Sequence, residues 1–287
     1  MSDGRTVVGF DGTPAAWRAL DWATERVAAR GGRLDIVQAV DRRLGETLTG
    51  RDASGTTAAE EGLRAAAEHA RALAPQALVE SRWMDGPPTR ALIAAAVDAT
   101  LLVVGTDRRP GGGDGAAVGS VPLTVAAKVG CVVAVIPDSP RAARKVVVAG
   151  VDASPYARSA LALAVTEASW LGGQVEAVHA WDVPEPFERP LDDDRTDPVA
   201  AAREQRVIPD AIADVPIART AAIVPVMVRS NPADALVSRG TGAAAIVVGT
   251  RGRGRVASSL LGSVSRDLLE NIPCPVLVTP KEWRDHG

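Results

Sequence analysis

The sequence predicts an α/β protein built from two tandem domains, each a doubly wound parallel sheet of five strands. The chain has 287 residues, which suits one large domain or two ordinary ones. Short β-rich runs alternate with longer helical patterns, which favours parallel α/β units over a β-sandwich. Features of the first half also return in the second half at a nearly constant spacing, so we expect the same fold twice.

The spacing of the repeat can be measured by subtraction. Three pairs give it: Asp11 and Asp152 (152 − 11 = 141), Pro88 and Pro232 (232 − 88 = 144), and Gly119 and Gly262 (262 − 119 = 143). Because the spacing changes so little, the two halves differ only by small loop insertions. We place the domains at residues 1–138 and 145–283, joined by a polar segment that contains proline.

The second half shows its elements most clearly, in the order expected for five strands with intervening helices. We expect strands at 145–151, 174–181, 221–228, 244–248 and 275–279. We expect helices at 155–171, with Ser154 as its cap and Gly172 as its stop, at 232–240 and at 263–271. A further helix should follow the polar segment 182–197. The first half repeats this order, with its own polar insert at 42–57.

Composition limits the classes of function. The hydrophobic content of 46% is ample for packed cores, and no apolar run reaches the roughly 18 residues of a membrane span. The N-terminus leads directly into a strand without the regions of a secretory signal, so we expect a cytoplasmic protein. A net charge of −3 gives no reason to expect nucleic acid or an anionic membrane as partner. A small molecule or another protein is the expected partner.

The two cysteines do not suggest redox or metal chemistry. Cys131 and Cys274 begin the last apolar run of each half, there is no CxxC, and the three histidines lie far apart. We therefore expect two buried residues at the start of strands, and no metal site.

A glycine-rich loop follows the fourth strand of the second half and has the parts of a phosphate site. Gly249, Gly252 and Gly254 lack Cβ, so the backbone can take positive φ here and bring its N–H groups close to an anion. Gly262 and Ser263 then open a helix, whose unpaired N–H groups and dipole favour a phosphate.

Three arginines, Arg251, Arg253 and Arg255, add positive charge to this loop. They either contact phosphate or form a solvated face, and Arg253 is included in the candidate site. Asp152 ends the first strand of the same half. If the first and fourth strands are neighbours, this carboxylate and the glycine loop share one crevice, although the sequence does not determine the strand order.

These residues resemble the ATP-binding universal stress proteins. The spacing G-x2-G-x9-G-[S/T] is met by the glycine loop, and each half has an early Asp-x-[Ser/Thr]-Pro. The segments VHAWD at 178–182 and CPVLVTP at 274–280 also resemble the family, so that the similarity covers nearly the whole chain as two domains. It implies a Rossmann-like fold of the adenine nucleotide α-hydrolase-like type.

The resemblance implies that the second half binds ATP, with or without Mg2+. Residues along the adenosine would be Gly150, Val151 and Asp152, and Ala180 would contact adenine through its backbone. The ribose and phosphates would be held by Val248, Gly249, Gly252, Gly262, Ser263, Val264 and Ser265. The alternative is that Asp152 only caps the next helix and the glycines only make a turn.

The first half departs from the pattern. Its corresponding candidates are Gly9, Phe10, Asp11, Ala39, Val104, Gly105, Gly119, Ser120 and Val121. Arg108 stands where the second glycine belongs, and Pro122 replaces the phosphate donor expected at Ser265. A working second site and a degenerate pocket kept for structure both stay open.

Binding is better supported than catalysis. There is no GxxxxGK[ST], no GxSxG, and no lysine in either glycine loop. His179 is either a catalytic base or a packed, hydrogen-bonded residue. We expect an ATP-binding regulatory protein that acts through protein partners. The alternatives are a slow ATPase or nucleotidyl transferase, and a nucleotide-free interaction scaffold.

Assembly follows from the exposed edges of the two sheets. The last strands, 132–136 and 276–278, are apolar enough to need a partner. The resemblance implies that they pair between the halves as an internal pseudo-dimer, and two chains would then associate as a homodimer.

Overall fold

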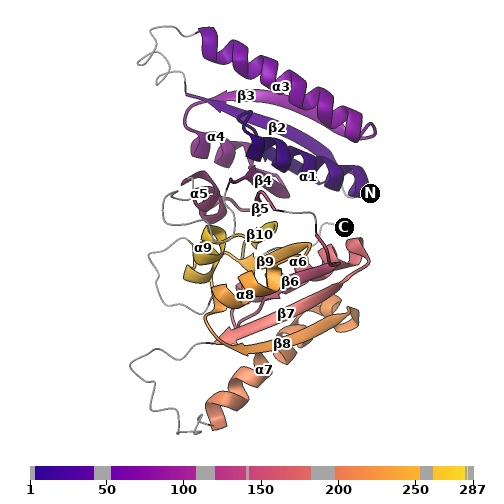
Figure 1. The fold of residues 1–287 in the computed structure, drawn as a ribbon, viewed down its shortest axis with the longest axis vertical. Helices are drawn as coiled ribbons and strands as arrows, with labels where there is room; N and C mark the ends of the chain where they lie inside the picture. The colour runs from indigo at the N-terminus through magenta and orange to yellow at the C-terminus, as the bar shows by residue number, and fades with distance from the viewer. Residues whose placement is uncertain are drawn as a thin grey trace.

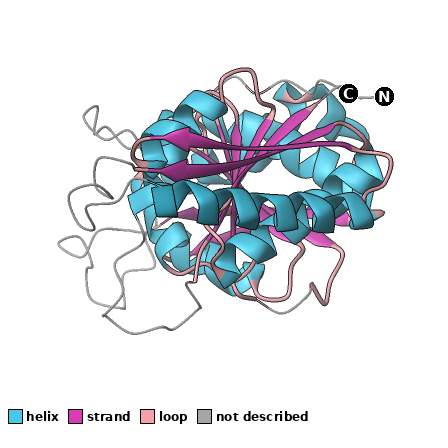
Figure 2. Ribbon diagram, turned by 90° about the horizontal axis from the view of Figure 1, so that it is seen from above, coloured by secondary structure: helices cyan, strands magenta, loops and turns pink. Residues whose placement is uncertain are grey.

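A computed structural model of the protein describes residues 4–41, 53–107, 120–139, 142–181, 198–252, 261–281 and 283. Within these residues the chain forms one sheet of ten strands with helices on both faces (Figures 1 and 2). The strand order is β3-β2-β1-β4-β5-β10-β9-β6-β7-β8. The two halves of the chain therefore lie end to end along one continuous sheet, as Figure 1 shows by colour.

The first half supplies five parallel strands. Its elements are β1 (Arg5–Gly9), α1 (Pro14–Arg30), β2 (Arg33–Val40), α3 (Ala53–Leu73), β3 (Leu78–Asp85), α4 (Pro88–Ala95), β4 (Leu101–Gly105), α5 (Ser120–Lys128) and β5 (Val132–Ile136). The chain moves from β1 outward to β3 and then returns past β1 to β4, so the winding reverses between β1 and β4.

The second half repeats this arrangement. Its elements are β6 (Val146–Gly150), α6 (Pro155–Leu171), β7 (Gln174–Trp181), α7 (Pro198–Asp214), the 3-10 helix η2 (Pro216–Thr220), β8 (Ile223–Arg229), α8 (Pro232–Gly240), β9 (Ala245–Gly249), α9 (Ser263–Glu270) and β10 (Val276–Thr279). These strands are also parallel, and β6 lies between β7 and β9. The prediction of two doubly wound sheets is confirmed.

The periodicity of the sequence placed the elements of the second half closely, with ends that differ by at most two residues. The expected helix after 182–197 is present as α7. The predicted end of the first polar insert, at residue 57, is wrong because α3 begins at Ala53. The buried positions Ala59, Leu63 and Ala70 recur on one face of this helix, and its N-terminal turn extends beyond the first of them.

The two halves join where β5 and β10 pair in antiparallel fashion, with Leu277 opposite Ala134. Every residue of both strands is buried. Such strands are covered by helices on both faces and need a partner at their open edge. The expected pairing of the last strands across the two halves is confirmed.

Two apolar layers hold the sheet, one on each face. The first packs α1, α3, α6 and α7 against the strands, and the second packs α4, α5, α8 and α9. Cys131 and Cys274 are buried in the second layer, as expected, and burial raises the pKa of their thiols to about 11 and about 12. None of the described helices is both long and apolar enough to cross a bilayer.

Candidate functional site

A cavity of about 800 Å³ opens at the carboxyl ends of β6, β7 and β9. This volume is in the range of small-molecule sites. Among the residues that line it are all the described candidates of the second half, namely Gly150, Val151, Asp152, Ala180, Val248, Gly249, Gly252, Gly262, Ser263, Val264 and Ser265. Arg253, the remaining candidate of that half, lies outside the described residues.

The strand order explains why these residues meet. β6 is hydrogen-bonded to β9 on one side and to β7 on the other, all in parallel. The carboxyl ends of the three strands therefore share one edge, at the point where the winding of this half reverses. Asp152 and the glycine loop face each other across this crevice, as the sequence predicted for neighbouring strands.

Gly249 and Gly252 serve close approach, which corrects the expectation of positive φ for these two, while Gly254 lies outside the described residues. Neither Gly249 nor Gly252 has positive φ. A Cβ on Gly252 would instead lie 2.6 Å from Asp152 Oδ2, and a Cβ on Gly249 would lie 2.5 Å from the Cβ of Tyr156. The missing side chains let the loop lie directly against the turn that follows β6.

Helix α9 begins at this loop and directs its first turn toward the cavity. Gly262 caps the helix with extended backbone, and none of the described side chains bonds to the cap. The N–H groups of the first turn and the hydroxyl of Ser263 therefore form an anion-binding surface. Ser265 is used differently, because its buried hydroxyl donates to the carbonyl of Gly249 over 2.7 Å. The hydroxyl proton of Ser265 is therefore used in a hydrogen bond within the protein.

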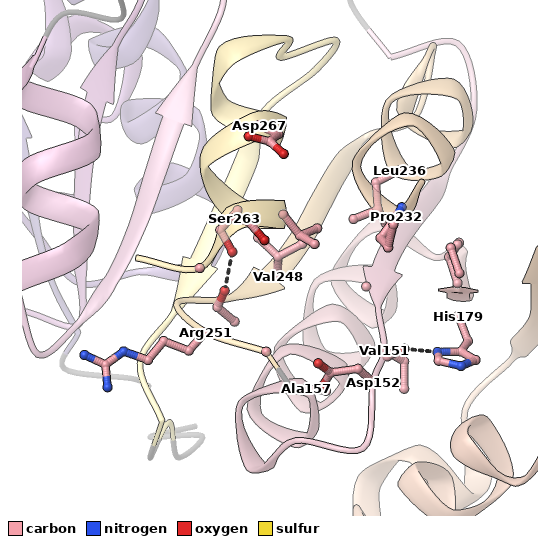
Figure 3. Close-up of a pocket in the computed structure, with 18 of the residues that line it drawn as sticks. Val151, Asp152, Ala157, His179, Pro232, Leu236, Val248, Arg251, Ser263 and Asp267 are labelled. Carbon is pink, nitrogen blue, oxygen red and sulfur yellow. Dashed lines mark hydrogen bonds between the residues drawn. The ribbon is translucent and has the colours of Figure 1, made fainter. Parts of the chain in front are cut away.

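Charged side chains of both signs line the α9 end of the cavity. Arg251, Arg266 and Asp267 are among them, while Arg255, like Arg253, lies outside the described residues. The side chain of Arg251 extends away from Asp152 and Ser263 (Figure 3). Sequence reasoning missed Arg266. It lies three residues after Ser263, so the helical repeat places it on the same side of α9.

Asp152 shapes the turn between β6 and α6. Its Oδ1 accepts the N–H of Ser154 at 2.9 Å, and Ser154 Oγ accepts the N–H of Ala157 as the helix cap. Capping is therefore done by Ser154, as predicted, and the carboxylate of Asp152 lies along the cavity.

His179 is buried and bonded at both ring nitrogens. Nδ1 lies 2.8 Å from the carbonyl of Val151 (Figure 3). Nε2 lies 2.7 Å from Oε2 of Glu204 on α7. The packed, hydrogen-bonded alternative for His179 is therefore confirmed. Glu204 also lines the cavity, and no sequence motif pointed to it.

The candidates of the first half lie at the equivalent edge of the sheet. Gly9 ends β1 and Phe10 and Asp11 follow it, Ala39 lies in β2, Val104 and Gly105 end β4, and Ser120 and Val121 begin α5. Gly119 lies outside the described residues. The side chain of Phe10 is buried in the core, with its ring 5.1 Å from that of Trp17.

Comparison with known proteins gives matches along the whole chain. The sequence model of the universal stress protein family matches residues 4–137 and 143–280. Universal stress protein Rv2623 of Mycobacterium tuberculosis (strain ATCC 25618 / H37Rv) is 32% identical over 307 residues, with 97% of this chain and 98% of that protein covered.

A solved structure shows the same architecture over nearly the whole chain. A universal stress protein from Archaeoglobus fulgidus DSM 4304 has a TM-score of 0.70 at 18% identity, with 98% of this chain and 100% of that chain covered. A universal stress protein solved in complex with cAMP is 29% identical and covers 48% of this chain and 100% of its own, with a TM-score of 0.38.

Proposed function

Because the chain belongs to the universal stress protein family, we propose that it is an ATP-binding regulatory protein whose nucleotide site is the cavity of the second half. One observation carries the proposal. A single cleft joins the N-terminus of α9 to the carboxylate of Asp152, which lies at the end of the adjacent strand β6. This combination suits a ligand with an anionic end and a polar, uncharged middle.

The phosphates are assigned to the end of the cleft at α9. The N–H groups of the first turn and the hydroxyl of Ser263 favour anions, and the guanidinium of Arg266 adds positive charge beside the carboxylate of Asp267. Close approach of the loop backbone at Gly252 brings further N–H groups within reach of a phosphate.

The nucleoside is assigned to the rest of the cleft. Asp152 can accept hydrogen bonds from ribose hydroxyls, since an ionised carboxylate only accepts. Beyond it, the backbone of Ala180 and the apolar side chains of Pro232 and Leu236 line the wall. These surfaces suit the edge and the faces of a purine ring.

A magnesium ion would enter with the phosphates. Across the described part of the chain, no group of three or more His, Cys, Asp or Glu side chains is placed to hold a metal. Mg2+ usually keeps several waters and takes one or two carboxylates plus phosphate oxygens, so the nucleotide would supply most of its ligands.

We propose a binding protein in preference to an enzyme. Both nitrogens of His179 are engaged in hydrogen bonds, which leaves this imidazole without a site to take a proton from water. Slow ATP hydrolysis is the second candidate, and its test is turnover. Regulation would follow from nucleotide occupancy read by protein partners in the cytoplasm, with a second copy of the chain as one such partner.

The test is the nucleotide content and the affinity of the purified protein. Mass spectrometry identifies what is released on denaturation, and calorimetry with ATP gives the dissociation constant and the stoichiometry. We expect ATP binding that is lost in Asp152→Ala and retained in Asp11→Ala if the second half holds the main site. Absence of ATP binding at millimolar concentration would leave the interaction scaffold as the function.

A further inference from the structure

Ser265 forms a hydrogen bond that leaves its own helix. Its buried hydroxyl donates to the carbonyl of Gly249 at 2.7 Å, 16 positions earlier in the chain. A serine or threonine inside a helix commonly bonds to the carbonyl four residues before it. Thr24 follows that pattern, with the carbonyl of Leu20 as its acceptor at 2.7 Å. Ser265 instead connects the first turn of α9 to the end of β9.

The peptide group between Gly249 and Thr250 is therefore held on both sides. Its carbonyl accepts from Ser265, and its N–H donates to the carbonyl of Thr279 at the end of β10 over 2.9 Å. The next carbonyl, that of Thr250, accepts the N–H of Gly262 at 2.8 Å. These three bonds fix the start of the glycine loop beside the first turn of α9.

The bond from Ser265 also determines which way the carbonyl of Gly249 points. Gly249 lines the cleft, where the partial negative charge of a carbonyl oxygen would repel a phosphate. The contact with a buried hydroxyl directs this oxygen toward α9 instead. Because glycine has the widest backbone freedom of any residue, the orientation of this peptide group depends on its hydrogen bonds.

The first half lacks this hydroxyl. Pro122 takes the position of Ser265, at the spacing that also relates Gly119 to Gly262 (265 − 122 = 143). The link to the last strand is kept, because the N–H of Thr106 donates to the carbonyl of Ile136 at 2.9 Å. The two halves thus share the bond from the loop to the last strand. Only the second half can form the bond from the loop to the helix.

We propose that Ser265 is a positioning residue, whose hydroxyl holds the glycine loop in the orientation that receives the phosphates of a nucleotide. It acts through the carbonyl of Gly249 and donates no hydrogen bond to the nucleotide, since its proton is already used. The inference rests on the proposed function and adds the group that sets the loop. The same bond makes the second half the better phosphate site of the two.

The experiment measures ATP affinity by calorimetry with the full chain. In Ser265→Ala the carbonyl of Gly249 loses its donor in a buried position. We expect this variant to bind ATP about 5-fold to 150-fold more weakly, the range that corresponds to an unsatisfied buried polar group. Ser265→Thr keeps the hydroxyl and should restore the affinity to within about threefold of the wild type.

Ser159→Ala is the matched control. Ser159 is also buried in a helix of the second half and donates to a backbone carbonyl, that of Lys281, at 2.7 Å, but it lies outside the lining of the cleft. Without nucleotide, both changes to alanine should lower the midpoint of thermal unfolding by a similar amount. Only Ser265→Ala should lose ATP affinity. If Ser265→Ala does not fold, Ser265→Cys takes its place, because a thiol of similar size is a weak donor.

The outcomes separate the two proposals. Wild-type affinity in the folded Ser265 variant that lacks the hydroxyl overturns the positioning role and leaves the ATP site standing. An equal loss of affinity in Ser159→Ala also overturns it, because the loss would then follow from general stability. The role is overturned as well if Ser265→Thr binds no better than Ser265→Ala. If the wild-type protein does not bind ATP, the proposed function itself fails.

Discussion

Glu167 of the second half accepts two hydrogen bonds from Arg26 of the first half, each at 2.5 Å. Arg30, one turn further along α1, bonds to the same carboxylate at 2.7 and 2.9 Å. The carboxylate is 94% buried, and the two guanidinium groups lie over the rings of Trp22 and Trp170. One buried anion on α6 thus ties the two halves together, on the face of the sheet covered by α1.

Loss of this anion should weaken the whole protein. In Glu167→Gln the two arginines keep their charges but lose their shared counter-ion, which typically costs about 3 kcal/mol for a buried pair. We expect chemical denaturation to show a loss of this order. Glu68→Gln is the control, because Glu68 forms an exposed pair with Arg64 at 3.5 Å and should change stability by less than about 0.5 kcal/mol. Equal effects of the two changes would contradict the assignment.

Acid should remove the same contribution. Burial raises the pKa of Glu167, but the hydrogen bonds and charges of Arg26 and Arg30 outweigh it and lower this pKa to about 2, below its ordinary 4.5. A lowered pKa stabilises the fold fully above about pH 4.5, and the contribution is lost as the pH falls toward 2. Thermal unfolding of wild type and Glu167→Gln should differ most near neutral pH and converge in acid. A difference that is constant with pH would refute the lowered pKa.

A side chain at Gly252 should weaken nucleotide binding. In Gly252→Ala the new Cβ would lie 2.6 Å from Asp152 Oδ2, so the loop or the carboxylate must move. Overpacking of this kind costs about 1–3 kcal/mol, and if that cost falls on the bound state it corresponds to a loss of about 5-fold to 150-fold in ATP affinity. Calorimetry with ATP measures it. Gly130→Ala is the control, since nothing lies within 4 Å of a Cβ there, and unchanged affinity in Gly252→Ala would show that the close approach is not required.

Much of the fold and part of the site follow from local sequence. Pro155 after Ser154, and Gly172 at φ 58°, give α6 ends that any context would produce. The repeat and its strand pattern also predict that Asp152 lies near the glycine loop, once β6 and β9 are neighbours. These features depend on residues that are close in the chain or on the rules of doubly wound sheets.

Other contacts depend on how separate helices meet, which local patterns do not encode. Glu204 reaches the cleft only because α7 packs against β7, and Glu167 meets Arg26 across 141 positions of the chain. The sequence also does not show why Gly249 and Gly252 are glycines, since a tight turn and a close approach of the backbone both require glycine. Sequence analysis considered only positive φ at these glycines, and the close approach becomes visible only from the positions of Asp152 and Tyr156.

We expect Gly105, the last residue of β4, to be required for packing of the fold. A Cβ on Gly105 would lie 2.1 Å from the carbonyl oxygen of Ala15, a backbone atom that cannot turn aside, just as Gly249 meets Tyr156 in the second half. We therefore expect Gly105→Ala to lower stability by more than about 3 kcal/mol in denaturation experiments, whether or not ATP is present. Gly62→Ala is the control, because its Cβ would meet only ordinary contacts inside helix α3 and should stabilise the fold by about 0.5–1 kcal/mol. If Gly105→Ala is as stable as wild type, packing does not explain why the first half keeps this glycine, and a ligand of that half becomes the better explanation.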